Sequence, residues 1–167
     1  MRSRGFVVNA SPLITLGRLA RLDLLTELAE VVIVPRGVID EVAAKSEKDW
    51  LVQAVERHAG VTVTPDVPPP VSLEDWDLGR GEQCVIAHVI GQPHLTAVLD
   101  DLRARQAAKA HALRITGTLG ILVRARRAGL IPRVWPLVAA MKDFGFYASD
   151  EVIRETLASV GEAPEEG

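Results

Sequence analysis

The chain has 167 residues, of which 48% are hydrophobic and 25% charged, and its formal net charge at pH 7 is −3. This length fits one domain, and the composition supplies enough apolar material for a core, which excludes a wholly disordered chain. No apolar run approaches the roughly 18 residues that span a bilayer, so we expect no membrane segment. The single cysteine, Cys84, cannot form an internal disulfide and lies in an apolar helical pattern, so we expect a packed thiol and a reducing, cytoplasmic setting.

The charge is unevenly distributed, because no Asp or Glu occurs between Leu102 and Lys142. The basic residues of this stretch are Arg103, Arg105, Lys109, Arg114, Arg124, Arg126, Arg127, Arg133 and Lys142. Such a block is a candidate surface for a polyanion. The alternative is that these residues form the solvated faces of ordinary helices and are balanced by acids elsewhere.

In chain order, short apolar runs alternate with helical patterns. "GFVVNA" (5–10) predicts a first strand, and Ser11 and Pro12 then predict a helix start with serine as N-cap and proline at the first helical position. "VVIV" (31–34) predicts a second strand, which a helix follows. "DWLVQAVERHAG" (49–60) predicts another helix with Gly60 as C-cap, and "VTVT" (61–64) a third strand.

The second half of the chain continues the alternation after a proline-rich connection at 65–72. It predicts a helix at 79–90, a fourth strand at 96–100, a helix at 103–113, a short fifth strand at 114–116 and a helix that stops at Gly129. Further helices are expected near 136–143 and at 149–159, the last capped by Ser149. The expected single domain spans 1–160, and the acidic residues 161–167 predict a frayed tail.

Strands that alternate with helices predict a three-layer α/β domain, in which parallel strands are joined by helical crossovers. Ligands in such folds bind beyond the carboxyl ends of the strands. Polar residues that follow the predicted strands are therefore candidates for a site.

Five such residues fall toward this edge. Asn9 ends the first strand, Glu41 lies in the helix after the second, Glu82 lies in the first turn of the helix before the fourth, and Asp100 and Asp101 end the fourth strand. Clustered carboxylates raise one another's pKa unless a cation neutralises them, and Mg²⁺ or Mn²⁺ prefers such oxygen ligands. The pattern therefore predicts a divalent-metal site that activates water and stabilises a phosphate.

Each of these residues also has a structural alternative. Asp100 or Asp101 suits a helix N-cap, and Glu82 suits the positive end of a helix dipole. Glu41 has Lys45 four positions later, which is a common helical pair, and Asn9 suits a turn at a strand end.

The sequence resembles PIN-domain proteins, and more narrowly a prokaryotic PIN-like subfamily, in several stretches that occur in order. These stretches are "VVNASPLITLGRL" (7–19), "VIVPRGVIDEV" (32–42), "LGRGEQCVIAHV" (78–89), "VLDDLRARQAAKAHALRITGTLGILVRARRAGLIP" (98–132) and "MKDFGFYAS" (141–149). The pieces "DDxxAR" (100–105) and "GTLGIL" (117–122) are typical of that subfamily. The resemblance implies a sheet of about five parallel strands in the order 3-2-1-4-5.

The resemblance also implies metal-dependent cleavage of phosphodiesters, usually in single-stranded RNA, and many relatives are VapC-type toxins with an antitoxin protein partner. By position, Glu41, Glu82 and Asp101 match the acids that hold the metal, and Asp100 is an extra acid of the subfamily. Asn9 stands where the family usually has aspartate. An amide oxygen can still bind a hard cation, but it brings no charge.

We therefore expect Glu41, Glu82, Asp100 and Asp101 to act in catalysis and Asn9, Glu41, Glu82 and Asp101 to bind Mg²⁺ or Mn²⁺. Candidates for contacts with RNA phosphates are Arg103, Arg105 and Lys109, although Arg103 could instead pair with Asp100 or Glu82. Aromatic residues make up 4% of the chain, so the composition indicates no platform for stacked bases. PIN-like proteins often dimerise, and the helices at 13–28 and 136–159 are candidates for a homodimer face. The competing function is an RNA- or protein-binding module with little catalysis, because Asn9 lacks a charge.

Overall fold

A five-stranded sheet organises the computed structural model, which describes residues 3–45 and 49–165. The strands are β1 (Ser3–Val8), β2 (Ala29–Pro35), β3 (Val61–Thr64), β4 (Leu95–Val98) and β5 (Ile115–Thr116). Their order is β3-β2-β1-β4-β5, and every neighbouring pair is parallel. The predicted α/β class and strand order are confirmed.

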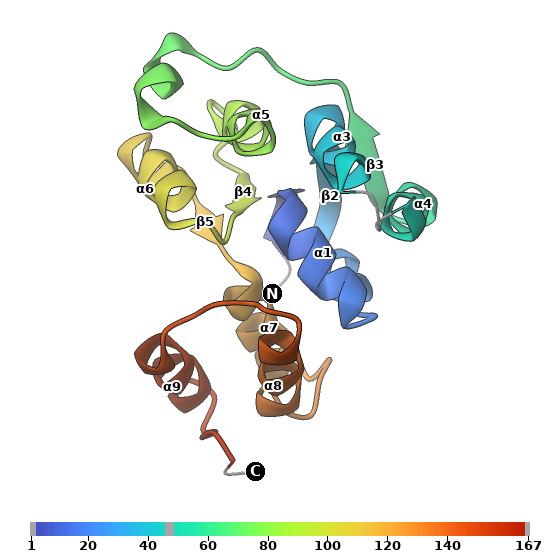
Figure 1. The fold of residues 1–167 in the computed structure, drawn as a ribbon, viewed down its shortest axis with the longest axis vertical. Coiled ribbons are helices and arrows are strands. Elements are labelled where there is room, and N and C mark those ends of the chain that lie inside the picture. The colour runs from blue at the N-terminus through green and yellow to red at the C-terminus, as the bar shows by residue number, and fades with distance from the viewer. Residues whose placement is uncertain (1–2, 46–48, 166–167) are drawn as a thin grey trace.

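Helices form the layers on either side of the sheet. The connections and the C-terminal part contain α1 (Ala10–Arg18), α2 (Asp23–Leu28), α3 (Arg36–Ala44), α4 (Asp49–Arg57), the 3-10 helix η1 (Val71–Trp76), α5 (Arg80–Val89), α6 (Leu102–Ala110), α7 (Thr118–Arg127), α8 (Trp135–Asp143) and α9 (Asp150–Ala158). Figure 1 shows α5 and α6 on one side of the sheet and α1 and α7 on the other. Helix α5 packs against β1, β2 and β4, and α7 packs against α1 and α2. Within the described ranges, none of these helices is long and apolar enough to cross a bilayer.

The central strands are buried on both faces, which explains why they read as continuous apolar runs. Phe6, Val7 and Val8 of β1 are fully buried, as are Ala97 and Val98 of the neighbouring β4. The sheet is therefore a rigid frame, and the residues that follow its strands are held at defined positions.

Three local expectations differ from the structure. The first helix begins at Ala10, with Asn9 rather than Ser11 as the N-cap residue, and Pro12 lies inside the first turn, where its missing N–H breaks no helical bond. Helix α4 ends at Arg57, and Gly60 has a φ of +89° in the turn before β3. The proline-rich connection leads directly into η1, which the sequence did not predict. Ser149 caps α9 as expected, because its hydroxyl accepts a hydrogen bond from the backbone N–H of Val152.

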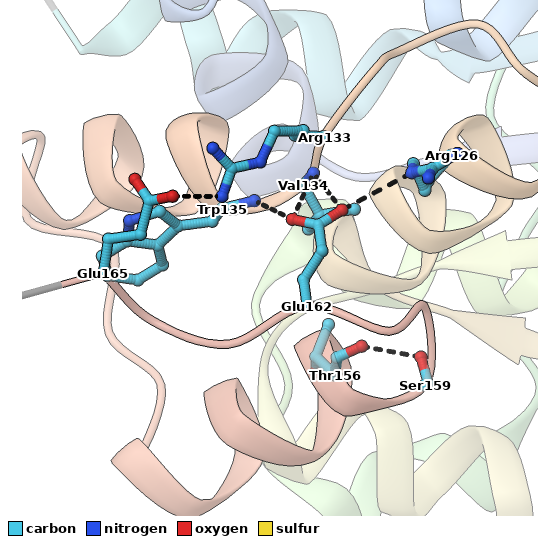
Figure 2. Close-up of polar contacts among 8 residues, drawn as sticks. All are labelled: Arg126, Arg133, Val134, Trp135, Thr156, Ser159, Glu162 and Glu165. Atoms are coloured by element: carbon cyan, nitrogen blue, oxygen red, sulfur yellow. Dashed lines mark hydrogen bonds and ion pairs between the residues drawn. The ribbon is translucent and has the colours of Figure 1, made fainter.

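The predicted acidic tail at 161–167 contacts the domain in its described part. Figure 2 shows the Glu162 carboxylate against the start of α8, where the backbone N–H groups of Val134 and Trp135 donate to it at 2.9 Å. Arg126 of α7 lies 3.5 Å from the same carboxylate, whose side chain is only 8% exposed. Residues 166–167 of the predicted tail lie outside the described residues.

Candidate functional site

The polar residues predicted at the strand ends lie at the carboxyl edge of the sheet. Val8 of β1 pairs with Val98 of β4, so the residues that follow these two strands emerge side by side. The backbone N–H of Asn9 donates to the carbonyl oxygen of Val98 at 3.1 Å. Asn9 therefore lies directly beside the segment that carries Asp100 and Asp101.

A cleft of about 440 Å³ opens at this edge and is lined by all five predicted residues, Asn9, Glu41, Glu82, Asp100 and Asp101. Helices α3 and α5 supply the two glutamates, and these helices pack against each other. The cleft thus combines side chains from separate parts of the chain, and four of the five are carboxylates.

Asn9 is the most deeply buried of these residues, with 5% of its surface exposed. Within the described part of the chain, its side-chain Oδ1 has no hydrogen-bond partner. Gly81 of α5 borders this oxygen, because a Cβ built there would overlap Glu41 Oε2 and lie 3.0 Å from Asn9 Oδ1. A buried acceptor without a donor costs roughly 1–3 kcal/mol. The amide oxygen is therefore poised for a ligand that this part of the chain does not supply.

The pKa of Glu82 depends on its burial and on the charges around it. Burial raises the pKa of Glu82, and the negative charges of Asp101 and Glu41 raise it further. A hydrogen bond from the backbone N–H of Gly79 to Glu82 Oε2, at 2.9 Å, opposes this shift, and the charge of Arg103 opposes it less strongly. Burial is the main cause of the net rise in the pKa of Glu82, and the two neighbouring carboxylates add to it; a nearby cation would favour the ionised form.

The two adjacent aspartates have different partners. Asp100 Oδ1 accepts from the backbone N–H of Thr118 at 2.7 Å, and Asp100 Oδ2 accepts from the Thr118 hydroxyl at 2.6 Å and from that of Ser11 at 3.4 Å. Asp101 Oδ1 accepts from the backbone N–H of Ala104 at 2.9 Å and caps α6. Asp100 therefore uses both oxygens at the start of α7, whereas among the described residues only Oδ1 of Asp101 accepts a hydrogen bond.

The structure separates the three predicted RNA-binding residues. Arg103 borders a second hollow together with Glu82 and Asp101, and it donates to the exposed Asp77 at 2.9 Å. Arg105 Nη1 donates to the carbonyl oxygen of Leu99 at 3.0 Å, which makes it a support for the β4–α6 turn. Lys109 lies in the last turn of α6 and lines neither hollow.

Aromatic side chains form one wall of the cleft, which the low aromatic content did not indicate. Phe144, Phe146 and Tyr147 follow α8, and Tyr147 is 89% exposed. Arg18 of α1 holds this segment, because Arg18 Nη1 donates to the carbonyl oxygen of Phe144 at 3.2 Å and the guanidinium lies 5.9 Å from the Phe144 ring centre. The available signal was the closing stretch "MKDFGFYAS", in which three aromatics cluster.

The cleft fits a hydrated divalent cation better than a tightly ligated one. Its donors are carboxylate and amide oxygens, which suit Mg²⁺ or Mn²⁺. Among the residues that the structure describes, no three His, Cys, Asp or Glu side chains are already arranged to hold a metal. Mg²⁺ usually keeps several waters and takes only one or two carboxylates, so the donor set fits such an ion.

Cys84 does not line the cleft. Cys84 is buried in α5, and burial together with the charge of Asp66 raises the pKa of its thiol to about 11. The thiol stays protonated at neutral pH, so the expectation of a packed, unreactive side chain is consistent with its surroundings.

Comparison with protein-family models matches residues 5–162 to a family described as a PIN domain. A search of curated proteins finds no match. The family match covers nearly the whole chain and agrees with the parallel sheet in the order 3-2-1-4-5. PIN domains have a nuclease-type fold that is associated with nucleic-acid binding. The chain belongs to the PIN-domain family.

Proposed function

We propose that the protein is a nuclease that uses Mg²⁺ or Mn²⁺ to cleave phosphodiester bonds of single-stranded RNA in the cleft at the carboxyl edge of the sheet. The observation that carries this proposal is the buried Oδ1 of Asn9, which has no donor within the described residues and shares the cleft with Glu41 and Glu82. The family match supports the nuclease class.

Asn9, Glu41, Glu82 and Asp101 would hold the metal ion. When bound, the ion would polarise a water molecule and stabilise negative charge on the phosphate. Asp100 would act indirectly, because its bonds to Thr118 and Ser11 fix the wall of the cleft.

Arg103 is the best placed cation for a phosphate contact. Its partner Asp77 is 92% exposed at the side chain, and exposed ion pairs contribute little. The Arg103 guanidinium can therefore exchange Asp77 for an RNA phosphate next to Glu82 and Asp101. Arg105 would position the turn, and Lys109 would contact RNA further along α6.

The aromatic wall supports a single-stranded substrate. Unpaired bases stack on exposed aromatic rings, whereas paired bases inside a duplex cannot. Tyr147 and Phe144 are both exposed and border the carboxylates, so a base that stacks on them brings its backbone to the cleft.

The direct test is cleavage of an end-labelled single-stranded RNA with EDTA, Mg²⁺ or Mn²⁺. Wild type should cleave only with metal, and Asp101→Asn, which retains a good N-cap residue, should lose the activity. Asp150→Asn is a matched control, because Asp150 is an exposed aspartate at the start of α9 and does not line the cleft. Loss of cleavage in both variants would contradict a site at Asp101.

A binding module with little catalysis is the second candidate, and Asn9 favours it. An amide brings no negative charge, so it weakens the hold on a divalent cation relative to aspartate. A folded wild-type protein that binds RNA without cleaving it, combined with cleavage by Asn9→Asp, would establish this second function.

The resemblance to toxin ribonucleases leads us to propose a cytoplasmic toxin with an antitoxin protein and a homodimeric state. Val152 of α9 is an exposed apolar side chain within the proposed dimer face at 13–28 and 136–159. A dimer mass in light scattering and a small protein that co-purifies from the native host are expected. A monomer at high concentration would contradict the dimer.

A further inference from the structure

The opposite edge of the sheet carries a third hollow, of about 870 Å³, which we name the basic groove. Its charged lining residues are Arg4, Glu30, Arg114, Arg124 and Arg127, together with His94. Arg4 lies near the start of β1, and Arg114 directly precedes β5. Because the strands are parallel, the groove lies at their amino ends, whereas the carboxylate cleft lies at their carboxyl ends.

The arginines of the groove carry positive charge that the chain leaves uncompensated. Within residues 3–45 and 49–165, no carboxylate lies within ion-pair distance of Arg4, Arg114, Arg124 or Arg127. Glu30 lines the same hollow but pairs with none of the four. Four described arginines outside the groove also have no carboxylate partner, but none of them lines it: Arg18, Arg57, Arg105 and Arg154. The feature that favours an external anion is therefore the gathering of four such arginines in one hollow.

Arg124 is the arginine of the groove best suited to bind an anion, because it is partly buried and held in place. Its Nη1 donates to the Ser3 hydroxyl at 2.8 Å, and its guanidinium lies 5.6 Å from the ring centre of Phe6. Burial lowers the pKa of Arg124, with no neighbouring charge acting in the other direction. A fixed, partly desolvated guanidinium favours a ligand anion more strongly than a mobile, hydrated one does.

We propose that the basic groove binds the phosphate backbone of RNA at a distance from the cleft, as a second contact surface of the substrate. This inference rests on the proposed function, since it assigns RNA as the ligand. Guanidinium groups match phosphate oxygens in pairs of hydrogen bonds. The exposed large apolar side chains of the described chain lie outside the groove, so it lacks the aromatic and apolar anchors that protein interfaces use. The contact should therefore be strong at low salt and indifferent to sequence.

The geometry predicts a dependence on RNA length. The 6 residues of β1 separate the two edges by about 20 Å, which corresponds to about 6 stacked nucleotides. An RNA of about 4 nucleotides can occupy one site only, whereas an RNA of about 20 nucleotides can contact both.

The test measures binding of labelled RNA to the full chain in EDTA, by fluorescence anisotropy over a series of salt concentrations. The double variant Arg114→Gln/Arg127→Gln should bind the RNA of about 20 nucleotides about tenfold more weakly, and its salt slope should fall by about 1.4, or about 0.7 for each lost phosphate contact. Its cleavage of the RNA of about 4 nucleotides with Mn²⁺ should match wild type. Glu30→Gln should strengthen binding of the longer RNA.

Arg154→Gln is the matched control, because Arg154 is an exposed arginine of α9 that does not line the groove. An equal loss in this control, or an unchanged affinity and salt slope in the double variant, would overturn the proposal, as would tighter binding of polyglutamate than of RNA. A protein that binds long RNA through the groove but never cleaves it would contradict the proposed nuclease while supporting the groove. Failure of the groove proposal and failure of the nuclease proposal therefore give different results.

Discussion

At the scale of single residues, Asn9 is the proposed metal ligand that brings no charge to the cleft. Asn9→Asp places a further carboxylate beside Glu41 and Glu82, so we expect Mn²⁺ to bind about tenfold more tightly in calorimetric titrations. Without metal, the same variant should be less stable than wild type, because it adds a like charge at a buried position. Asn9→Ala should weaken Mn²⁺ binding. Equal Mn²⁺ affinity in all three proteins would exclude Asn9 from the site.

Gly81 keeps space open between two of the proposed ligands. A methyl group there would overlap Glu41 Oε2 and press on Asn9 Oδ1, so Gly81→Ala should lower Mn²⁺ affinity about tenfold. Gly79→Ala is a close control, because its Cβ would meet Glu82 Oε2 at an ordinary 3.5 Å and the backbone N–H to Glu82 is kept. Indistinguishable metal affinity in the two variants would show that the contact at Gly81 does not matter.

The raised pKa of Glu82 predicts a pH dependence with a definite sign. Below the ordinary glutamate pKa, Glu82 is protonated in folded and unfolded chains and contributes no pH dependence. As pH rises from that value through the higher folded pKa, the metal-free protein should lose stability, because the unfolded chain ionises first. Mn²⁺ competes with the proton, so the rise in Tm on adding Mn²⁺ should grow over the same range. Glu82→Gln should remove this growth, and a Tm shift that is independent of pH in wild type would contradict the assignment.

At the scale of elements, we expect the two adjacent aspartates to have different roles, Asp100 in stability and Asp101 in metal-dependent cleavage. Asp100→Ala leaves the N–H and hydroxyl of the fully buried Thr118 without their acceptor, so the free energy of unfolding should fall by about 3 kcal/mol. Asp101→Ala removes only an N-cap and should cost about 1 kcal/mol, yet it should abolish metal-dependent cleavage. Denaturant unfolding and the cleavage assay measure the two effects. The reverse ranking of stabilities would show that the roles are exchanged.

The elements themselves were predictable because their signals are local. The buried part of strand β1 is covered on both faces and therefore reads as a short continuous apolar run, which its length and the flanking polar residues assign to a strand. The start of α1 was predicted at the wrong residue, since Ser11 and Pro12 are also compatible with first-turn positions. The spacing did not predict the partners of the two aspartates, because both suit an N-cap. The three-dimensional arrangement brings the start of α7 to the segment after β4, where Thr118 donates to Asp100.

At the scale of the whole molecule, Glu162 ties the end of the chain to α7 and α8 (Figure 2). Glu162→Ala leaves two backbone N–H groups without their acceptor and removes the ion pair with Arg126, so the free energy of unfolding should fall by about 2–3 kcal/mol. Glu165→Ala is the matched control, because it removes only an exposed ion pair with Arg133 and should change stability little.

This contribution of Glu162 has its own pH dependence. Burial opposes ionisation, but the N–H groups of Trp135 and Val134 and the nearby arginines lower the pKa of Glu162 overall. The stabilisation is therefore complete above the ordinary glutamate pKa and is lost as pH falls through the lower folded value. Equal acid sensitivity of wild type and Glu162→Ala would contradict this role.

The sequence did not predict most of the features that depend on contacts between distant parts of the chain. The carboxylates could be assigned to one edge because parallel strands share a direction, and the cleft does contain all of them. The aromatic wall comes from residues 144–147, far along the chain from Asn9, and its position depends on how α8 packs. The sequence showed the basic block, but not how the fold divides it. Arg103 borders the hollow that shares Glu82 and Asp101 with the cleft, whereas Arg114, Arg124 and Arg127 lie at the opposite edge of the sheet.

The most direct test of the central claim is a crystal structure of the protein soaked in Mn²⁺, with the ion located by its anomalous scattering. We predict an anomalous peak within coordination distance of Asn9 Oδ1 and of at least one carboxylate among Glu41, Glu82 and Asp101. A peak elsewhere, with Asn9 Oδ1 accepting a hydrogen bond from the protein, would contradict the metal site and the nuclease proposed from it.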